Sequence, residues 1–322
     1  MSNSPSQPSP GNPMSSSQEG HKSHVLVSAT GDVLTSKNVN TKRDQDRTQE
    51  EVRYTSVILK RNDLTLRHPG DTLEIAIHEG LEQFKRNQVS LLLSSLAAGL
   101  NVAFSAMAVA IAYAVAMPME NPLVSKFLVA LVYPLGFIIC IMSGAKLFTE
   151  HTATALYPVL DGQAKLSKLF KLWGIVLSGN LVGATVSAFL LTIALPVIKA
   201  KEGFLLLGHH LVDPTSEQLL ISAILAGWLM AQGGWLVMAS TSTLAQMMGI
   251  YIVTFIIGLA GFHHSIAGTA EMMAALFMGN EFTLFQTGRF ILISVLGNLL
   301  GGSIFVGVLN YAHIRQLQKQ EK

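Results

Sequence analysis

The stretch Gly261-Phe262-His263-His264-Ser265-Ile266-Ala267 lies in the middle of an apolar run that covers residues 246–278. A membrane-spanning helix needs about 20 apolar residues, so this run is too long for one regular span. Glycine, histidine and serine side chains interrupt it at its centre. Unpaired backbone groups are costly in hydrocarbon, so such a break is tolerated only where it contacts protein or lines a cavity. We therefore interpret the run as one broken helix whose halves meet near His264.

A second long run, residues 124–160, carries Ser143-Gly144-Ala145-Lys146 near its middle and is interpreted in the same way. Six crossings would place both termini on the same side of a membrane. Eight Lys and Arg residues flank the spans on that side and four on the other, which predicts that both termini are cytoplasmic. The other four apolar runs cover residues 89–117, 171–195, 219–239 and 288–312.

The composition agrees with an integral membrane protein. Half of the 322 residues are hydrophobic and 13% are charged, against about 25% in soluble domains. Of the 42 charged residues, 22 lie within residues 1–89. The net charge of +2 provides no basic surface, so no nucleic-acid partner is expected. Cys140 is the single cysteine, which excludes an internal disulfide and a cysteine-based zinc site, and neither a metal nor a cofactor is predicted.

Four segments are predicted along the chain. Residues 1–68 form a polar, mostly disordered tail, in which residues 51–68 alternate weakly and favour extended structure. Residues 69–88 form an amphipathic helix capped by Asp71 or Thr72, either leading into the membrane or packed on its cytoplasmic face. The transport domain and a cytoplasmic tail follow at residues 89–312 and 313–322.

An internal repeat connects the two halves of the membrane domain. Gly179-Asn180-Leu181-Val182-Gly183 recurs as Gly297-Asn298-Leu299-Leu300-Gly301, at an offset of 118 residues. The same offset takes Lys146 in the first break to His264 in the second. Three spans per repeat give an inverted topology, in which broken helices meet at the membrane midplane. The alternative is chance recurrence of small-residue helix contacts, and the two asparagines are expected to form helix-packing hydrogen bonds.

Ionisable residues mark the breaks as the candidate pathway. A histidine inside a membrane, such as His264, indicates a pathway or a proton relay, although a packing hydrogen bond is the alternative. Glu271 lies two helical turns further on the same face and is placed to share a proton with His264, or else to face a subunit contact. His263 points about 100° away, which favours a structural role. Lys146 attracts anions or pairs with Glu150.

Enzyme signatures such as His-Glu-x-x-His, Gly-x-Ser-x-Gly and a Walker A loop are absent from the sequence. The main hypothesis is therefore a channel or transporter, not an enzyme. The alternatives are the same fold carrying a neutral or cationic solute through a His/Glu proton relay, an intramembrane enzyme using His263, His264 and Glu271, and a regulatory membrane protein with a vestigial pore.

Three ordered motifs resemble the formate/nitrite transporter family. Ser143-Gly144-Ala145-Lys146-Leu147-Phe148-Thr149 is similar to its Gly-x-x-Leu-Phe-Thr loop. The histidine-containing stretch 261–267 is similar to its Gly-Phe-x-His-Ser-Ile-Ala segment. Residues 297–302 are similar to its last-span Gly-Asn-x-x-Gly-Gly. The likeness extends over residues 70–312.

The resemblance implies an all-α, aquaporin-like protomer of six helices in two inverted three-helix repeats, with broken second and fifth helices. It implies a homopentamer in a bacterial inner membrane, with one pore per protomer for small monovalent anions of weak acids such as formate or nitrite. His264 aligns with the family's central pore histidine, which protonates or hydrogen-bonds the passing anion. The family's gating loop and apolar constrictions fall on Leu147, Phe148, Thr149, Tyr133, Phe137 and Ile257.

Overall fold

The computed structural model describes residues 26–27, 33–34 and 66–320. The chain divides into two units, residues 1–62 and residues 63–322. In the first unit, β1 (Leu26–Val27) pairs antiparallel with β2 (Val33–Leu34), a pairing that the composition of the tail did not predict. The rest of the predicted disordered tail and most of the weakly alternating segment 51–68 lie outside the described residues.

The second unit is helical, with six stretches long and apolar enough to cross a membrane among the described residues. They match the six apolar runs of the sequence and confirm the predicted all-α membrane fold. These stretches contain α4 (Gln88–Ala116), α5 (Pro122–Val132) with α6 (Pro134–Met142), α8 (Leu166–Ile193), α11 (Ser216–Ala239), α12 (Thr243–Ala260), and α14 (Leu284–Leu300) continued by the π-helix η2 (Gly301–Val308) and α15 (Leu309–Gln320).

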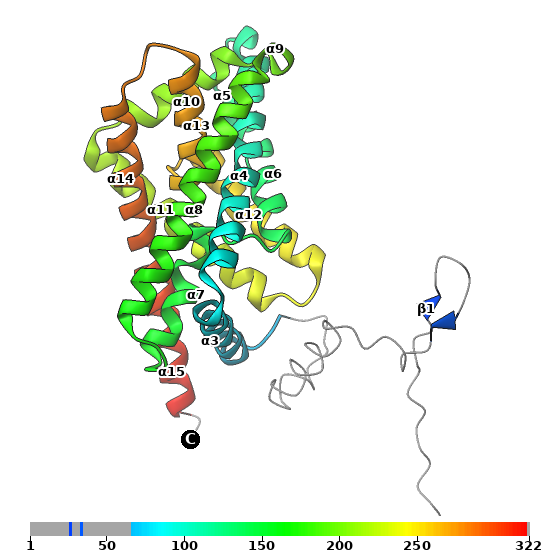
Figure 1. Ribbon diagram of the computed structural model, residues 1–322, viewed down its shortest axis with the longest axis vertical. Coiled ribbons are helices and arrows are strands. Elements are labelled where there is room, and N and C mark those ends of the chain that lie inside the picture. Colours follow the sequence, from blue (N-terminus) through cyan, green and yellow to red (C-terminus); the bar gives the residue numbers. More distant parts are fainter. Residues whose placement is uncertain (1–25, 28–32, 35–65, 321–322) are drawn as a thin grey trace, which may run out of the picture. The chain divides into compact units, whose positions relative to one another are not determined.

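Shorter elements complete the bundle: α3 (Pro69–Lys85), η1 (Met117–Met119), α7 (Phe148–Leu160), α9 (Leu195–Ile198), α10 (Lys201–Val212) and α13 (Ser265–Met278). Figure 1 shows α3 and α15 at one end of the bundle, hereafter the α3 end, and α9 and α10 towards the other, hereafter the α10 end. The second and fifth spans are broken as predicted. Helix α7 completes the span begun by α5 and α6, and α13 completes the span begun by α12.

Helix α3 begins at a different cap from the one that the sequence suggested. Its N-cap is His68, whose Nδ1 accepts a hydrogen bond from the backbone N–H of Gly70 at 3.2 Å. The expected caps, Asp71 and Thr72, lie within the first turn. The reason is Pro69, which has no N–H and is pre-organised for the first helical position, so the cap lies three or four residues earlier than predicted.

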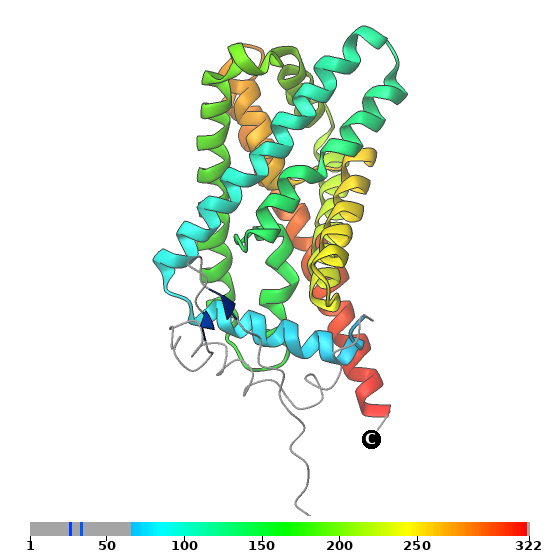
Figure 2. The same cartoon turned by 90° about the vertical axis from the view of Figure 1, so that its right-hand side faces the viewer.

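The apolar face of α3 is covered by protein. Leu73 and Ile77 pack with Tyr157 of α7 and Ile314 of α15, while Figure 2 shows α3 lying across the end of the bundle. At Gly80 the helix approaches α7 so closely that an added Cβ would lie 2.5 Å from the carbonyl oxygen of Thr154. Of the two alternatives for residues 69–88, the structure therefore supports a helix packed against the end of the transport domain.

A proline separates α5 from α6 and turns the chain before the first break. Pro134 has no N–H to donate, so the helix loses one backbone hydrogen bond. Ser105 of α4 binds the backbone on both sides of Pro134: its hydroxyl donates to the carbonyl of Tyr133 at 2.7 Å and accepts from the N–H of Gly136 at 3.0 Å. This contact fixes the short α6, and with it Phe137, against α4.

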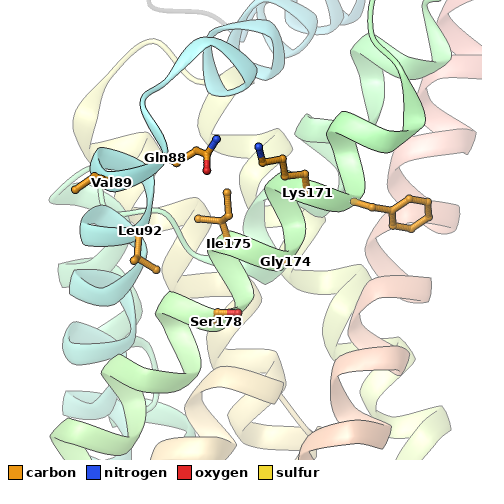
Figure 3. Close-up of a pocket in the computed structure, with 8 residues that line it drawn as sticks. Gln88, Val89, Leu92, Lys171, Gly174, Ile175 and Ser178 are labelled. Carbon is orange, nitrogen blue, oxygen red and sulfur yellow. The ribbon is translucent and has the colours of Figure 1, made fainter.

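A surface hollow lies on the outer face of α4 and α8. It has a volume of about 570 Å³ and is lined by apolar side chains such as Leu92 and Ile175, with Gln88 and Lys171 at one end (Figure 3). It shares no lining residue with either helix break. The hollow is therefore separate from the candidate pathway.

Candidate functional site

Each broken span ends its first half at a glycine in the left-handed conformation. Gly144 has φ +74° after α6, and Gly261 has φ +69° after α12. Glycine adopts this conformation without a Cβ clash and ends helices for that reason. The two glycines are 117 residues apart, so the breaks occupy equivalent places in the two repeats.

Asn180 of α8 binds the backbone on both sides of the first break. Its Nδ2 donates to the carbonyl of Lys146 at 2.9 Å and to the carbonyl of Ser95 on α4 at 2.7 Å. Its Oδ1 accepts from the N–H of Phe148, the first residue of α7, at 2.8 Å. One buried amide thus pairs three backbone groups that hydrocarbon could not satisfy.

Asn298 of α14 makes the same set of contacts at the second break. Its Nδ2 donates to the carbonyl of His263 at 3.0 Å and to that of Ala223 on α11 at 2.7 Å. Its Oδ1 accepts from the N–H of Ser265, the first residue of α13, at 2.7 Å. Both asparagines therefore do more than the predicted helix packing, because each also joins the two sides of a break.

This geometry confirms the inverted repeat but corrects its register within the breaks. The asparagines are 118 residues apart, whereas the residues that they bind differ by 117: Lys146 corresponds to His263, and Phe148 to Ser265. The repeat partner of His264 is consequently Leu147, not Lys146 as predicted. The difference arises because one residue fewer separates Phe148 from Asn180 than separates Ser265 from Asn298.

The asparagines reach the breaks because their helices contact neighbouring helices at glycine. A Cβ added to Gly99 of α4 would lie 2.2 Å from the carbonyl oxygen of Asn180. A Cβ added to Gly227 of α11 would lie 2.2 Å from that of Asn298. Backbone-to-backbone approach of this kind is typical of small-residue contacts in membrane helices.

His264 lies at the junction of the two half-helices. It is 1% exposed, and as N-cap of α13 its Nδ1 accepts a hydrogen bond from the N–H of Ala267 at 3.1 Å. In the neutral ring, Nε2 therefore carries the hydrogen and donates it to Oγ1 of Thr149 on α7 at 2.7 Å. The pair joins the N-terminal ends of α7 and α13, where both helix dipoles are positive.

Aromatic side chains cover one side of the imidazole. The ring of Phe137 meets that of His264 edge-on, with centroids 4.9 Å apart, and Tyr133 lies beyond Phe137 at 5.2 Å. The predicted constriction residues Leu147, Phe148 and Ile257 are each at most 2% exposed. The structure thus places Phe137 against His264, and it buries Leu147, Phe148 and Ile257 near the junction of the half-helices.

A small cavity adjoins His264 on the side of α10. Its volume of about 30 Å³ is enough for about one water molecule. Glu271, Tyr133 and Ile257 line it together with His264. Glu271 is 4% exposed, and its Oε1 has no hydrogen-bond partner. The predicted juxtaposition of His264 and Glu271 on one face of α13 is therefore present.

His263 and Lys146, which are repeat partners, both lie outside this cavity. The ring of His263 is held by the hydroxyl of Ser222 at Nδ1, 2.7 Å, and donates from Nε2 to the carbonyl of His210 at 3.2 Å. Lys146 Nζ lies 3.3 Å from Nε2 of His151. Both side chains therefore make polar contacts away from the cavity that His264 lines.

Three residues of the site were missed by sequence reasoning. Tyr113 of α4 and His210 of α10 line the cavity, and the His210 ring stacks on His263 with centroids 4.9 Å apart. Ser222 of α11 holds His263. A tyrosine within the first apolar run and the His209-His210 pair in the break after the third run were the available signals, but neither pattern indicates which helices become neighbours.

The arrangement is suited to holding a small polar solute. Within residues 66–320, no group of three or more His, Cys, Asp or Glu side chains is placed to bind a metal ion. A hydrogen-bond donor on His264 and two positive helix ends favour an anion. The dry layer around them opposes any solute that keeps its charge.

Comparison with known proteins agrees with this geometry. The family model described as "Formate/nitrite transporter" matches residues 70–312, most of the chain and both breaks. The chain belongs to the formate/nitrite transporter family. This confirms the resemblance seen in the three motifs and identifies the protein as a multi-pass membrane channel of that family.

Relatives and solved structures of the formate/nitrite transporter family support the assignment. Inner membrane protein YfdC of Escherichia coli (strain K12) is 31% identical over 250 residues, which cover 75% of this chain and 79% of that protein. A probable formate transporter of Methanothermobacter thermautotrophicus is 27% identical over 210 residues, which cover 59% of this chain and 76% of that protein.

Two solved structures share the fold. An "FNT family ion channel" superposes with a TM-score of 0.67 at 20% identity, covering 76% of this chain and 98% of that one. A "Pentameric formate channel with formate bound" superposes with a TM-score of 0.61 at 20% identity, covering 71% of this chain and 98% of that one. These likenesses confirm the predicted fold of the transport domain.

Proposed function

We propose that this protein conducts small monovalent anions of weak acids, of the formate or nitrite kind, with a proton and without converting them chemically. The observation that carries the proposal is the contact between His264 and Thr149, 2.7 Å long, at the point where two half-helices meet. An anion that enters this layer replaces Thr149 as the acceptor for the Nε2 hydrogen of His264. Protonation of the anion then removes the charge that the apolar layer opposes.

The pathway of this proposal contains the residues predicted from the sequence in three groups. Tyr133, Phe137 and Ile257 form the apolar wall on the α10 side of the histidine. Leu147, Phe148 and Thr149 form the constriction on the α7 side. Lys146 and His263 belong to the two breaks themselves, and their side chains contact His151 and Ser222 respectively.

The proposal also covers the oligomeric state, the membrane and the orientation of the protomer. We place it as a homopentamer in a bacterial inner membrane, because the formate channel that shares its fold is pentameric and the relative YfdC is named an inner membrane protein. Both termini lie in the cytoplasm, in keeping with the Lys and Arg bias of the loops. The α3 end is then cytoplasmic, and the cavity beside Glu271 lies on the side of α10, towards the outer face.

A specific observation favours a second candidate, conduction of a small cation such as ammonium. The cavity holds the carboxyl of Glu271, and neither Lys nor Arg is among its lining residues. An ionised carboxylate there would attract a cation and repel an anion. The two candidates differ in whether Glu271 holds its proton while a solute binds.

Flux through proteoliposomes tests both candidates. Purified protein is reconstituted, and uptake of formate, nitrite and ammonium is followed with a pH-sensitive dye inside the vesicles. We expect uptake of the weak-acid anions with acidification, and a reduction of about 100-fold in His264→Ala. His313→Ala, a change at an exposed histidine of α15, is the matched control and should behave like wild type. Uptake of ammonium alone would favour the second candidate, and no uptake of any of the three would refute both.

A further inference from the structure

The helix cap restricts what His264 can do with a proton. Because the N–H of Ala267 donates to Nδ1 at 3.1 Å, a second proton on that nitrogen would place two donors against each other. The neutral ring can donate a hydrogen bond from Nε2, but only the imidazolium form releases a proton readily. His264 is therefore suited to bind an anion by a hydrogen bond, and the transferable proton needs another carrier.

Glu271 is the ionisable group placed to carry that proton. It lines the same cavity as His264, is 4% exposed, and has an oxygen, Oε1, without a hydrogen-bond partner. A buried, ionised carboxylate without a cationic partner costs several kcal/mol in such surroundings. Burial thus favours the protonated carboxyl, which can donate to an anion.

The groups that face Glu271 do not compensate its charge. Around the cavity, α4 contributes Tyr113, the junction of α5 and α6 contributes Tyr133, α10 contributes His210, and α13 itself contributes His264. Helices α8 and α14, which also pack against α13, contribute no residue to this cavity. All four facing side chains are neutral in their ordinary hydrogen-bonded forms.

We propose that Glu271 is the proton donor to the solute and thereby limits the conducted anions to those of weak acids. In this step the O–H bond of the Glu271 carboxyl breaks and a new O–H bond forms on the bound anion, leaving a carboxylate and a neutral acid. The neutral acid crosses the apolar layer along His264 and Thr149. A proton from water on the α10 side then restores Glu271. Anions of strong acids, such as chloride, cannot take a proton from a carboxylic acid and are excluded.

The inference rests on the proposed function, and its test separates the two. Full-length protein in proteoliposomes is offered formate, chloride, or formamide, an uncharged molecule of similar size and shape to formate. The variants are Glu271→Gln, which keeps the shape but transfers no proton, Glu271→Asp, which keeps the carboxyl, and Glu150→Gln. Glu150 is a matched control, because it is 9% exposed on the other half-helix, also has an oxygen without a hydrogen bond, and does not line the cavity.

We expect Glu271→Gln to lower proton-linked formate uptake by about 100-fold, the usual size of a general-acid contribution. Formamide uptake should stay at the wild-type rate, because a neutral solute needs no proton. Glu271→Asp should restore part of the formate uptake, Glu150→Gln should match wild type, and chloride should not enter in any variant.

Three results would overturn the inference while the proposed function stands: unchanged formate uptake in Glu271→Gln, an equal loss of formamide and formate uptake, or passage of chloride through wild type. A wild-type protein that passes no weak acid would refute the proposed function itself, and the inference with it.

Discussion

The break between α6 and α7 and the break between α12 and α13 have the same backbone but different side chains. Both follow a left-handed glycine and both are bound by one asparagine through three hydrogen bonds. At the cap position, however, the first has Leu147 and the second has His264. Backbone groups need the same partners in either repeat, so the scaffold stays symmetric, whereas the chemistry is confined to one copy.

The two breaks also differ in what surrounds them. The second adjoins a cavity of about 30 Å³, whereas Leu147 and Phe148 of the first are enclosed by packed side chains. The space next to His264 therefore lies on the α10 side. The first break acts as a closed wall that presents the hydroxyl of Thr149 to the histidine.

The largest expected effect comes from removing the shared amide. Asn180→Leu and Asn298→Leu each delete three hydrogen bonds and leave buried backbone groups unpaired. We expect each to lower the free energy of unfolding in detergent by about 3 to 5 kcal/mol. A marked difference between the two losses in unfolding titrations would show that the two asparagines are not equivalent.

Substitutions at the close glycine contacts should lower the free energy of unfolding by a smaller amount. In Gly99→Ala and Gly227→Ala the new Cβ meets a carbonyl oxygen at 2.2 Å, so the paired helices must move apart. We expect each change to lower the free energy of unfolding by about 2 kcal/mol. Gly174→Ala on α8 is the control, because its Cβ would have no neighbour within 4 Å. Equal stability of all three variants in the same titration would contradict the close approach.

The contact between the half-helices should affect transport more than stability. Thr149→Val removes the acceptor for His264, and Thr149→Ser keeps it. A hydrogen bond is worth about 1 kcal/mol, so we expect formate uptake to change by about fivefold in the valine variant and to stay near wild type in the serine variant. Equal uptake in both variants would show that the first break contributes only its shape.

The smallest effect is expected far from the breaks, at the α3 end. Burial acts to raise the pKa of Asp161, but hydrogen bonds from Gln163, Tyr311 and Arg315 prevail and hold that pKa below its usual value. A carboxyl with a lowered pKa stabilises the fold above its unfolded pKa of about 3.9 and loses this contribution as the pH falls through its folded pKa.

Asp161→Asn should therefore lower stability at neutral pH by about 1 kcal/mol. The difference from wild type should shrink as the pH falls below about 4 and vanish below the folded pKa of Asp161. Thermal unfolding in detergent at several pH values measures this. Formate uptake should not change, because the residue lies in the turn after α7 and lines no part of the cavity. A difference that persists at low pH would contradict the ionic origin of the contact.

Much of the fold and the centre of the site could be predicted from local patterns. The apolar runs, the two glycine-containing breaks and the repeated Gly-Asn motifs are visible because each depends on residues close together in the chain. The joining of the second break by Asn298 was missed because its partners there, Ser265 and His263, are 33 and 35 residues away. The same limit hid the stacking of His210 on His263 and led to the one-residue error that paired Lys146 with His264.

The sequence by itself determined six spans, two of them broken, and an imidazole at one break, because hydrocarbon demands long apolar segments and tolerates exceptions only where they are satisfied. The tertiary structure decided which nitrogen of that imidazole faces Thr149, which asparagine binds each break, and that the carboxyl of Glu271 shares a cavity with the ring. These facts depend on distances between side chains from different helices. No periodicity along the chain encodes them.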